Sequence, residues 1–230
     1  AIHSKGYLSD FIGDPMLRGL WGENLTNVLT KSVELAGGRM AKLRIQLKEE
    51  DIDPLPEDNA TYQSRSTRIT LYSPYTTEIG RNVLRRWKTI RGLMRSVELE
   101  SQARGTNYTW VLELREDLLW VQPLDLRKFN VSSEASLFGI DCLLYGGIND
   151  KALLYNQNAG SLLAYRYGAF YNTSNPMLDN CHNAESYLGA LVTAFDIPVT
   201  LVPVSYIGAV STMRRCIAGH PKHGDALRHR

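Results

Sequence analysis

Along most of the chain, short apolar segments alternate with amphipathic helical segments, and this alternation most constrains what the chain can fold into. Runs with the length of strands fall at 40–47, 68–72, 110–114, 118–121, 138–144 and 197–204. Segments with the 3.6-residue spacing of a helix fall at 25–35, 77–104, 150–164 and 184–195. Strands that alternate with helices favour a parallel sheet. The sequence therefore predicts an α/β fold with a mainly parallel mixed sheet flanked by helices.

Length and composition are those of an ordinary globular protein. The chain has 230 residues, of which 43% are hydrophobic and 22% are charged, and its net charge is +2. A chain of this length can bury a sizeable core. The small net charge argues against nucleic acid as a partner, and no apolar window is long enough to predict a membrane span.

Five Asn-x-Ser/Thr patterns, the acceptor pattern for N-glycosylation, bear on the cellular compartment. They begin at Asn24, Asn59, Asn107, Asn130 and Asn172. Chance predicts roughly two such patterns in this composition, so we expect a chain of the secretory pathway with these loops exposed. The alternative is coincidence. Three cysteines, Cys142, Cys181 and Cys216, allow at most one internal disulfide.

A charged segment follows the apolar run at 110–114. Glu113, Arg115 and Asp117 lie at every second position, so on a strand their side chains share one face and Leu112 and Leu114 the other. Ligands bind at the carboxyl ends of strands in open α/β sheets. Carboxylate oxygens at such a place suit Mg²⁺ or Mn²⁺, which offset the charge of a diphosphate. The alternative is a solvated turn with surface charges.

The helix predicted over 77–104 carries a basic stripe. Its members fall within a narrow arc of the helix: Arg81, Arg85, Lys88 and Arg95. Because paired arginines bind phosphate oxygens bidentately, the stripe is a candidate for contacts with a nucleotide. An ordinary solvated helix face is the alternative.

Three further carboxylates have both a chemical and a structural interpretation. Glu185 lies in the first turn of a helix that Asn183 can cap, where it is favoured by the helix dipole or serves as a general base. Asp141 lies inside an apolar run and needs a partner if it is buried. Asp150 is placed to cap the helix predicted over 150–164.

The order of these segments resembles a divergent group of GT-A-type glycosyltransferases found in algae, fungi and large algal viruses. In that group a basic helix leads into a strand of the form W-V-x-R-x-R-x-D. The chain has Trp110-Val-Leu-Glu-Leu-Arg-Glu-Asp117 there, with Glu113 in place of the first arginine. The later elements of the group match at 141–146, 183–188, 196–199 and 213–215. The resemblance covers about 77–215.

The resemblance implies a GT-A fold that transfers a sugar from a nucleotide-diphosphate donor to a hydroxyl of a glycan or glycoconjugate. A divalent cation, Mn²⁺ or Mg²⁺, would be bound by Asp117 and Glu113. The donor would be contacted by Arg81, Arg85, Arg115 and Glu116. Glu185 and Asp141 would be the catalytic residues. The compartment implied is the Golgi lumen.

The resemblance also sets an expected domain organisation. A single GT-A-like domain over 1–230 would comprise a Rossmann-like donor-binding half at 1–125, an acceptor half at 126–218 and a mobile tail at 219–230. Such domains open with an apolar strand, so we expect that strand to lie upstream of Ala1. Two alternatives remain open: a non-catalytic glycan- or protein-binding module on a degenerate transferase fold, and a phosphate-handling hydrolase that uses the carboxylates of 113–117.

Overall fold

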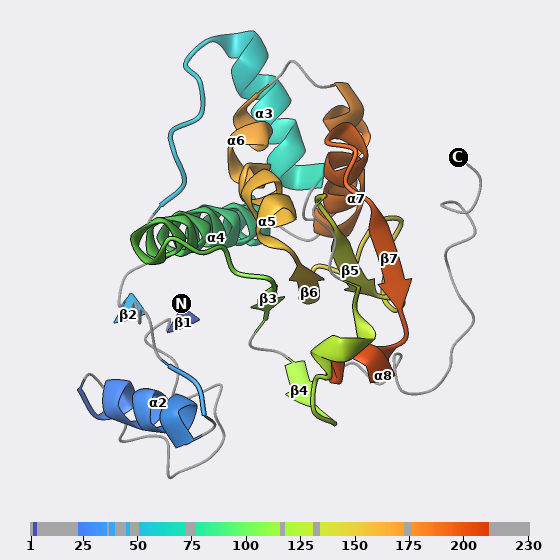
Figure 1. Cartoon of the computed structure of the whole chain (residues 1–230). Helices are drawn as coiled ribbons and strands as arrows, with labels where there is room; N and C mark the ends of the chain where they lie inside the picture. Colours follow the sequence, from blue (N-terminus) through green and yellow to red (C-terminus); the bar gives the residue numbers. More distant parts are fainter. Residues whose placement is uncertain are drawn as a thin grey trace. The chain divides into compact units, whose positions relative to one another are not determined.

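The computed structural model describes residues 2–3, 23–35, 37–39, 45–46, 51–71, 77–115, 118–130, 134–172 and 176–211. The chain divides into two compact units, Ala1–Asp51 and Ile52–Arg230. The first unit contains helix α2 (Glu23–Leu35) and the short parallel strands β1 (Ile2–His3) and β2 (Ile45–Gln46) (Figure 1). The helix predicted at 25–35 is therefore confirmed, whereas the tail predicted at 219–230 lies outside the described residues.

The second unit contains a four-stranded mixed sheet in the order β3-β6-β5-β7. Its strands are β3 (Val111–Leu114), β5 (Leu137–Ile140), β6 (Ala152–Tyr155) and β7 (Val199–Val202). Strand β6 is antiparallel to both of its neighbours, and only β5 and β7 pair in parallel. The predictions of an α/β fold and of a mixed sheet flanked by helices are confirmed, but the prediction that the sheet is mainly parallel is wrong for these strands.

Strand β6 explains that error. We predicted a helix over 150–164, whereas the structure has β6 followed by helix α5 (Gln157–Ala164). All four residues of β6 are buried, because both faces of the sheet are covered at this strand. A strand buried on both faces shows no alternation of apolar and polar residues, so its apolar run merged with that of the next helix.

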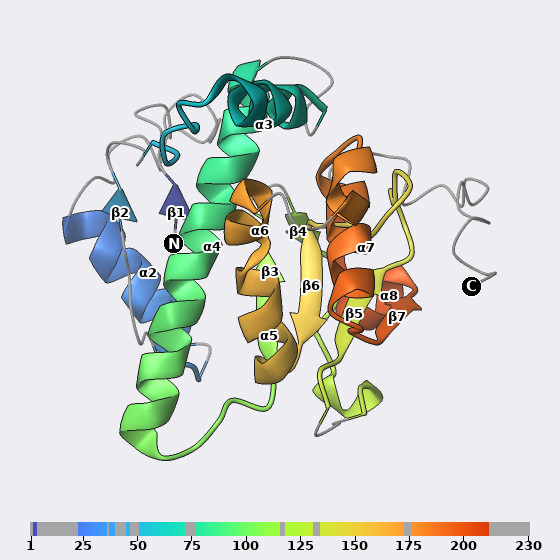
Figure 2. The same ribbon diagram turned by 90° about the horizontal axis from the view of Figure 1, so that it is seen from above.

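Helices cover one face of the sheet. They are α4 (Thr77–Arg104), α5, α6 (Arg166–Tyr171) and α7 (Ala184–Ala194), and they lie above the sheet in Figure 1 and in front of it in Figure 2. The bounds predicted for α4 are confirmed, and α7 begins at the predicted residue. On the other face lie the short helix α8 (Val204–Ile207) and the antiparallel pair β4 (Leu118–Trp120) and β8 (Ala209–Ser211).

The two faces of β6 belong to two apolar clusters. Leu153 and Tyr155 pack in the larger cluster beneath the helices, where Trp87 of α4 stacks on Tyr187 of α7 with 4.6 Å between ring centroids. Ala152 and Leu154 pack in a smaller cluster on the opposite face. Burial of these side chains on both faces is the main stabilising contribution to the sheet.

Residues 68–72, which we predicted to form a strand, belong instead to helix α3 (Asn59–Leu71) as far as Leu71. The helix is polar, but it buries Arg65, Arg68 and Ile69. The guanidinium groups of both arginines donate to the carbonyl oxygen of Phe170, in the last turn of α6. Carbonyl groups at the end of a helix have no hydrogen-bond partner within the helix, and these two arginines donate to one of them. The position of α3 is therefore set by tertiary hydrogen bonds rather than by an apolar stripe.

The crossing of α3 and α4 depends on a glycine. A Cβ at Gly80 would lie 2.2 Å from the carbonyl oxygen of Ile69, whereas a Cβ at Gly92, on the exposed side of α4, would meet nothing within 4 Å. We expect Gly80→Ala to lower the free energy of unfolding by about 1–3 kcal/mol and Gly92→Ala to raise it by about 0.5–1 kcal/mol. Urea unfolding followed by tryptophan fluorescence measures both. Equal effects of the two substitutions would contradict the close crossing.

Candidate functional site

Three strands of the sheet, β3, β5 and β6, bring charged residues to one edge. The register pairs Leu114 with Ala152 and Ile140 with Val202, so the carboxyl ends of β3, β5 and β7 meet the amino end of β6. Arg115 follows β3, and its backbone N–H donates to the carbonyl oxygen of Lys151 at 2.9 Å. The chain thus places Arg115, Asp141 and Asp150 at the same edge, where ligands bind in open α/β sheets.

At this edge, two carboxylates and three guanidinium groups form a charged cluster. Its members are Arg86, Glu113, Arg115, Asp150 and Arg166. Arg86 Nη1 donates to Asp150 Oδ2 at 2.6 Å, and Arg86 Nη2 donates to Glu113 Oε1 at 3.3 Å. Arg115 Nη1 reaches Asp150 Oδ1 at 3.5 Å. Arg166 donates to Glu113 Oε2, so each carboxylate is bound by two arginines.

Both carboxylates of the charged cluster are buried. The side chains of Glu113 and Asp150 expose 8% and 4% of their surface. Burial by itself would raise the pKa of Asp150, but the positive charges of Arg86 and Arg115 outweigh it and hold that pKa below its ordinary value. Tyr155 keeps its proton, because burial and the negative charge of Glu113 raise the pKa of its hydroxyl well above the ordinary value. That hydroxyl donates to Glu113 Oε2 at 3.1 Å.

The loop 141–149 lies against the start of α7. The backbone N–H of Ile148 donates to the carbonyl oxygen of Glu185 at 3.0 Å, and a Cβ at Gly147 would lie 1.8 Å from that oxygen. Leu143 and Tyr145 have positive φ values of 53° and 44°. Strained backbone of this kind persists only where the surroundings fix it, and it clusters at functional sites. The loop therefore fixes Glu185 relative to the sheet edge.

Glu185 lies in the first turn of α7, as predicted, and Asn183 caps the helix. The side chain of Asn183 accepts from the backbone N–H of Ser186, and the Ser186 hydroxyl oxygen accepts from the backbone N–H of Asn183.

Burial and the negative charge of Asp150 raise the pKa of Glu185 to about 7, against the opposing charges of Arg115 and Lys151. Glu185 can therefore accept or release a proton near neutral pH, which suits a general base or acid.

The basic stripe predicted on α4 does not converge on the charged cluster. Arg85 Nη1 donates to Glu78 Oε1 at 2.6 Å and to Asn82 Oδ1 at 2.8 Å, both on its own helix. Lys88 Nζ donates to Asp53 Oδ1 at 2.9 Å. Arg81 has its Nε buried without a hydrogen-bond partner. Arg86, which is not part of the basic stripe, contacts Glu113 and Asp150 instead.

The residues predicted to bind a metal have different surroundings. Both oxygens of Glu113 accept from arginine or tyrosine donors, so the structure gives that prediction no support. Asp117 and Glu116 lie outside the described residues. In the described part of the chain, no three His, Cys, Asp or Glu side chains gather in a way that could hold a metal ion. Asp141 lies directly after β5, with its backbone N–H bonded to the carbonyl oxygen of Val202 at 2.8 Å.

Sequence reasoning missed three residues of the charged cluster. Asp150 was interpreted as a helix cap, because β6 was not recognised. Arg86 follows Arg85 in sequence and therefore points about 100° away from it around α4, well outside the arc of the basic stripe. Arg166 had no local signal, since its position opposite Glu113 depends on how α6 folds back onto the sheet. A buried charge needs a partner of opposite sign, but sequence does not show which charges are buried.

Comparisons with known proteins do not add to this site. No family model, no curated protein and no solved structure matches the chain. Among the helices of the described residues, none has the length and apolar character that crossing a membrane requires.

Glu113 should contribute strongly to stability, because it neutralises two arginines in the sheet interior. Glu113→Gln leaves Arg86 and Arg166 without this countercharge and should lower the free energy of unfolding by about 2–4 kcal/mol. Glu98→Gln is the matched control, because Glu98 pairs with the exposed Arg95 on α4 at 3.6 Å and should cost less than about 1 kcal/mol. Urea unfolding of the two variants compares them. Similar losses would contradict the buried role of Glu113.

The raised pKa of Glu185 predicts a pH dependence of stability. Between the ordinary value of 4.5 and about 7, the folded state binds this proton and the unfolded state releases it. The stabilisation is complete below 4.5 and is lost as the pH rises through 7. The amide side chain of the Glu185→Gln variant does not titrate, so the variant does not lose this stabilisation. Its free energy of unfolding, minus that of the parent chain, should therefore increase by roughly 1–3 kcal/mol from about pH 5 to about pH 8. Thermal unfolding at both pH values tests this, and a constant difference would contradict it.

Proposed function

We propose that the chain is a glycosyltransferase that moves a sugar from a nucleotide-diphosphate donor to a hydroxyl of a glycan or glycoconjugate. The observation that carries the proposal is the pairing, at one sheet edge, of an arginine-rich cluster with a carboxylate whose pKa is about 7. The arginine-rich cluster suits an anionic leaving group, and the carboxylate of Glu185 suits the deprotonation of a hydroxyl. The order of motifs that resembles GT-A-type transferases adds to it.

The guanidinium groups of the cluster are suited to bind an anion. Arg86 and Arg115 are partly exposed, with 23% and 30% of their side-chain surface accessible, and both are oriented by Asp150. Positive charge that is partly withdrawn from water attracts phosphate oxygens more strongly than an exposed lysine or arginine does.

A transfer mechanism follows from these groups. The guanidinium groups of Arg115 and Arg86, which are held in place by Asp150, stabilise the negative charge that develops on the departing diphosphate. Glu185 in its ionised form takes the proton from the acceptor hydroxyl as that oxygen attacks the sugar. Asp141, at the same edge, is proposed as the second catalytic residue, in contact with the acceptor.

The described residues of the cluster do not fit a divalent cation. The carboxylate oxygens of Glu113 already accept hydrogen bonds from arginines and from Tyr155, and those of Asp150 accept from two arginines. The proposed Mn²⁺ or Mg²⁺ site therefore depends on Asp117, and we assign no step of the mechanism to the metal. Arg81, Arg85 and Glu116 remain proposed donor contacts. A Golgi location is proposed as well, on the basis of the five acceptor patterns for N-glycosylation.

Nucleotide binding gives the first test of the proposal. A ligand that binds only the folded state stabilises it by about 2.7 kcal/mol at a hundredfold excess over its dissociation constant. We expect one of UDP, GDP and CMP to raise the melting temperature of the purified chain. If Asp117 holds a metal, Mn²⁺ should enlarge that shift, and Asp117→Asn should remove the Mn²⁺ dependence. No shift with any nucleotide would contradict the transferase.

Turnover separates the transferase from its alternatives. In the presence of donor and acceptor, we expect Glu185→Gln to lower the transfer rate by at least about a hundredfold while the nucleotide still raises the melting temperature. Glu98→Gln should keep the parent rate. Nucleotide binding without transfer to any acceptor would indicate a binding module. Release of the sugar or of phosphate without an acceptor would indicate a hydrolase.

A further inference from the structure

The loop between α4 and β3 presents one of the five acceptor patterns, Asn107-Tyr108-Thr109. Gly105, with a φ of 65°, ends α4, and the side chains of Asn107 and Thr109 are exposed. The loop is held in place, because the backbone N–H of Tyr108 donates to Gln157 Oε1 at 2.8 Å. An exposed asparagine in a surface loop is the setting in which a folded protein carries an N-glycan.

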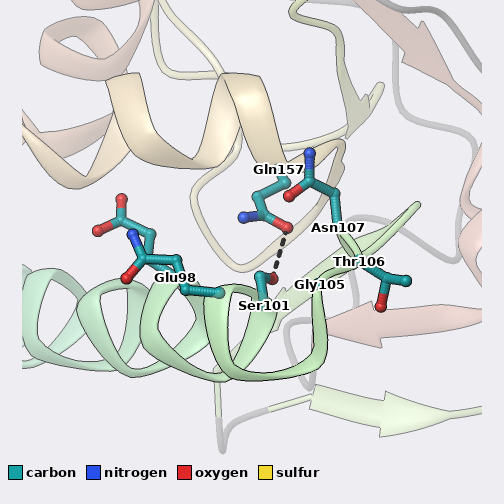
Figure 3. Close-up of a pocket in the computed structure, with 7 residues that line it drawn as sticks. Glu98, Ser101, Gly105, Thr106, Asn107 and Gln157 are labelled. Carbon is teal, nitrogen blue, oxygen red and sulfur yellow. Dashed lines mark hydrogen bonds between the residues drawn. The ribbon is translucent and has the colours of Figure 1, made fainter.

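A polar hollow lies beside Asn107. Its volume is about 310 Å³, and it is lined by Glu98, Ser101, Gln102, Gly105, Thr106, Asn107 and Gln157. Figure 3 shows the side chains of Asn107 and Gln157 on this hollow, with the hydrogen bond from Ser101 to Gln157 at its wall. Carboxylate, amide and hydroxyl groups bind the hydroxyl and acetamido groups of a sugar. The volume is at the small end of ligand pockets, which suits the innermost sugars of a glycan.

Among the acceptor patterns whose three residues all lie in the described part of the chain, Asn107 is the best placed, because Asn24 lies in helix α2 and Asn59 in helix α3. Asn59, Asn130 and Asn172 are also exposed. Asn59, however, is the first residue of helix α3, and the amide nitrogen of Asn172 already donates to the hydroxyl of Tyr165 at 3.4 Å.

We propose that Asn107 is N-glycosylated and that the first acetamidohexose units of its glycan occupy this hollow. Asn107 Nδ2 forms a bond to the anomeric carbon of an oligosaccharide carried on a lipid diphosphate. The bond from that carbon to the diphosphate oxygen breaks, the lipid diphosphate leaves with the electron pair, and Nδ2 loses one proton. The co-reactant is the lipid-linked oligosaccharide of the secretory pathway.

The glycan leaves the proposed transfer site free. Asn107 and Gln157 lie at the edge of the sheet where Val111 pairs with Tyr155, whereas the charged cluster lies where Leu114 pairs with Ala152. The modification therefore does not depend on the proposed function, and each can fail without the other.

The test uses the full chain secreted from a eukaryotic cell behind a secretion signal. Peptide mass spectrometry before and after enzymatic removal of N-glycans should show a glycan on Asn107. Thr109→Ala, which keeps the asparagine, should remove that glycan, and Thr109→Ser, which keeps the pattern, should retain it. A bare Asn107 in a secreted parent chain would overturn the proposal.

Hydrogen exchange tests the occupied hollow. An endoglycosidase that leaves one acetamidohexose on Asn107 should keep the backbone amides of 101–109 exchanging at least about threefold more slowly than in Thr109→Ala. Amides of the exposed segment 121–128 serve as an internal control and should not change. Equal exchange at 101–109 in the trimmed and unglycosylated proteins would show that the sugar projects into solvent, and would overturn the assignment of the hollow.

Discussion

The burial of Glu113 between two arginines is the constraint on which much of the second unit depends. Its carboxylate joins β3 to α4 through Arg86 and to α6 through Arg166. A buried carboxylate without such partners would cost several kcal/mol, so α4 and α6 cannot pack on the sheet independently of it. Because Arg86 also binds Asp150, the same contact orders the loop before β6. Asp150 in turn raises the pKa of Glu185. One buried charge thus links the packing of two helices to the protonation of a residue on a third.

The sequence predicted those elements whose local pattern matches their environment. Helices α4 and α7 each have one apolar face, and the cap at Asn183 is a local interaction, so their positions were predictable. Strand β6 and helix α3 were mispredicted for opposite reasons. Strand β6 is covered on both faces and shows no period, whereas α3 is held by buried arginines that an amphipathic pattern cannot reveal. The predicted mixed sheet is confirmed, but the prediction that it is mainly parallel was wrong, because β6, which is antiparallel to both of its neighbours, was not recognised as a strand.

The candidate site was predictable in its location but not in its contacts. The carboxyl end of β3 and the first turn of α7 were both predicted, and the structure brings Arg115 and Glu185 to the same edge. The partner of each carboxylate was not predictable, because the choice of Arg86 over Arg81 or Arg85 depends on the rotation of α4 about its axis. Glu113 departs from the arginine of the resembling motif, and its ion pairs with two arginines indicate that its position is structural rather than metal-binding.

The close contact at Gly147 gives a criterion for recognising relatives of this protein. The backbone of this residue and the first turn of α7 touch so closely that no other amino acid fits without displacing the helix. A homologous sequence can therefore keep Asp150 and Glu185 and still separate them, if it carries a side chain at the position of Gly147. In an alignment, covariation of this glycine with the two acids would distinguish chains that retain the proton-transfer geometry from chains that retain only the fold.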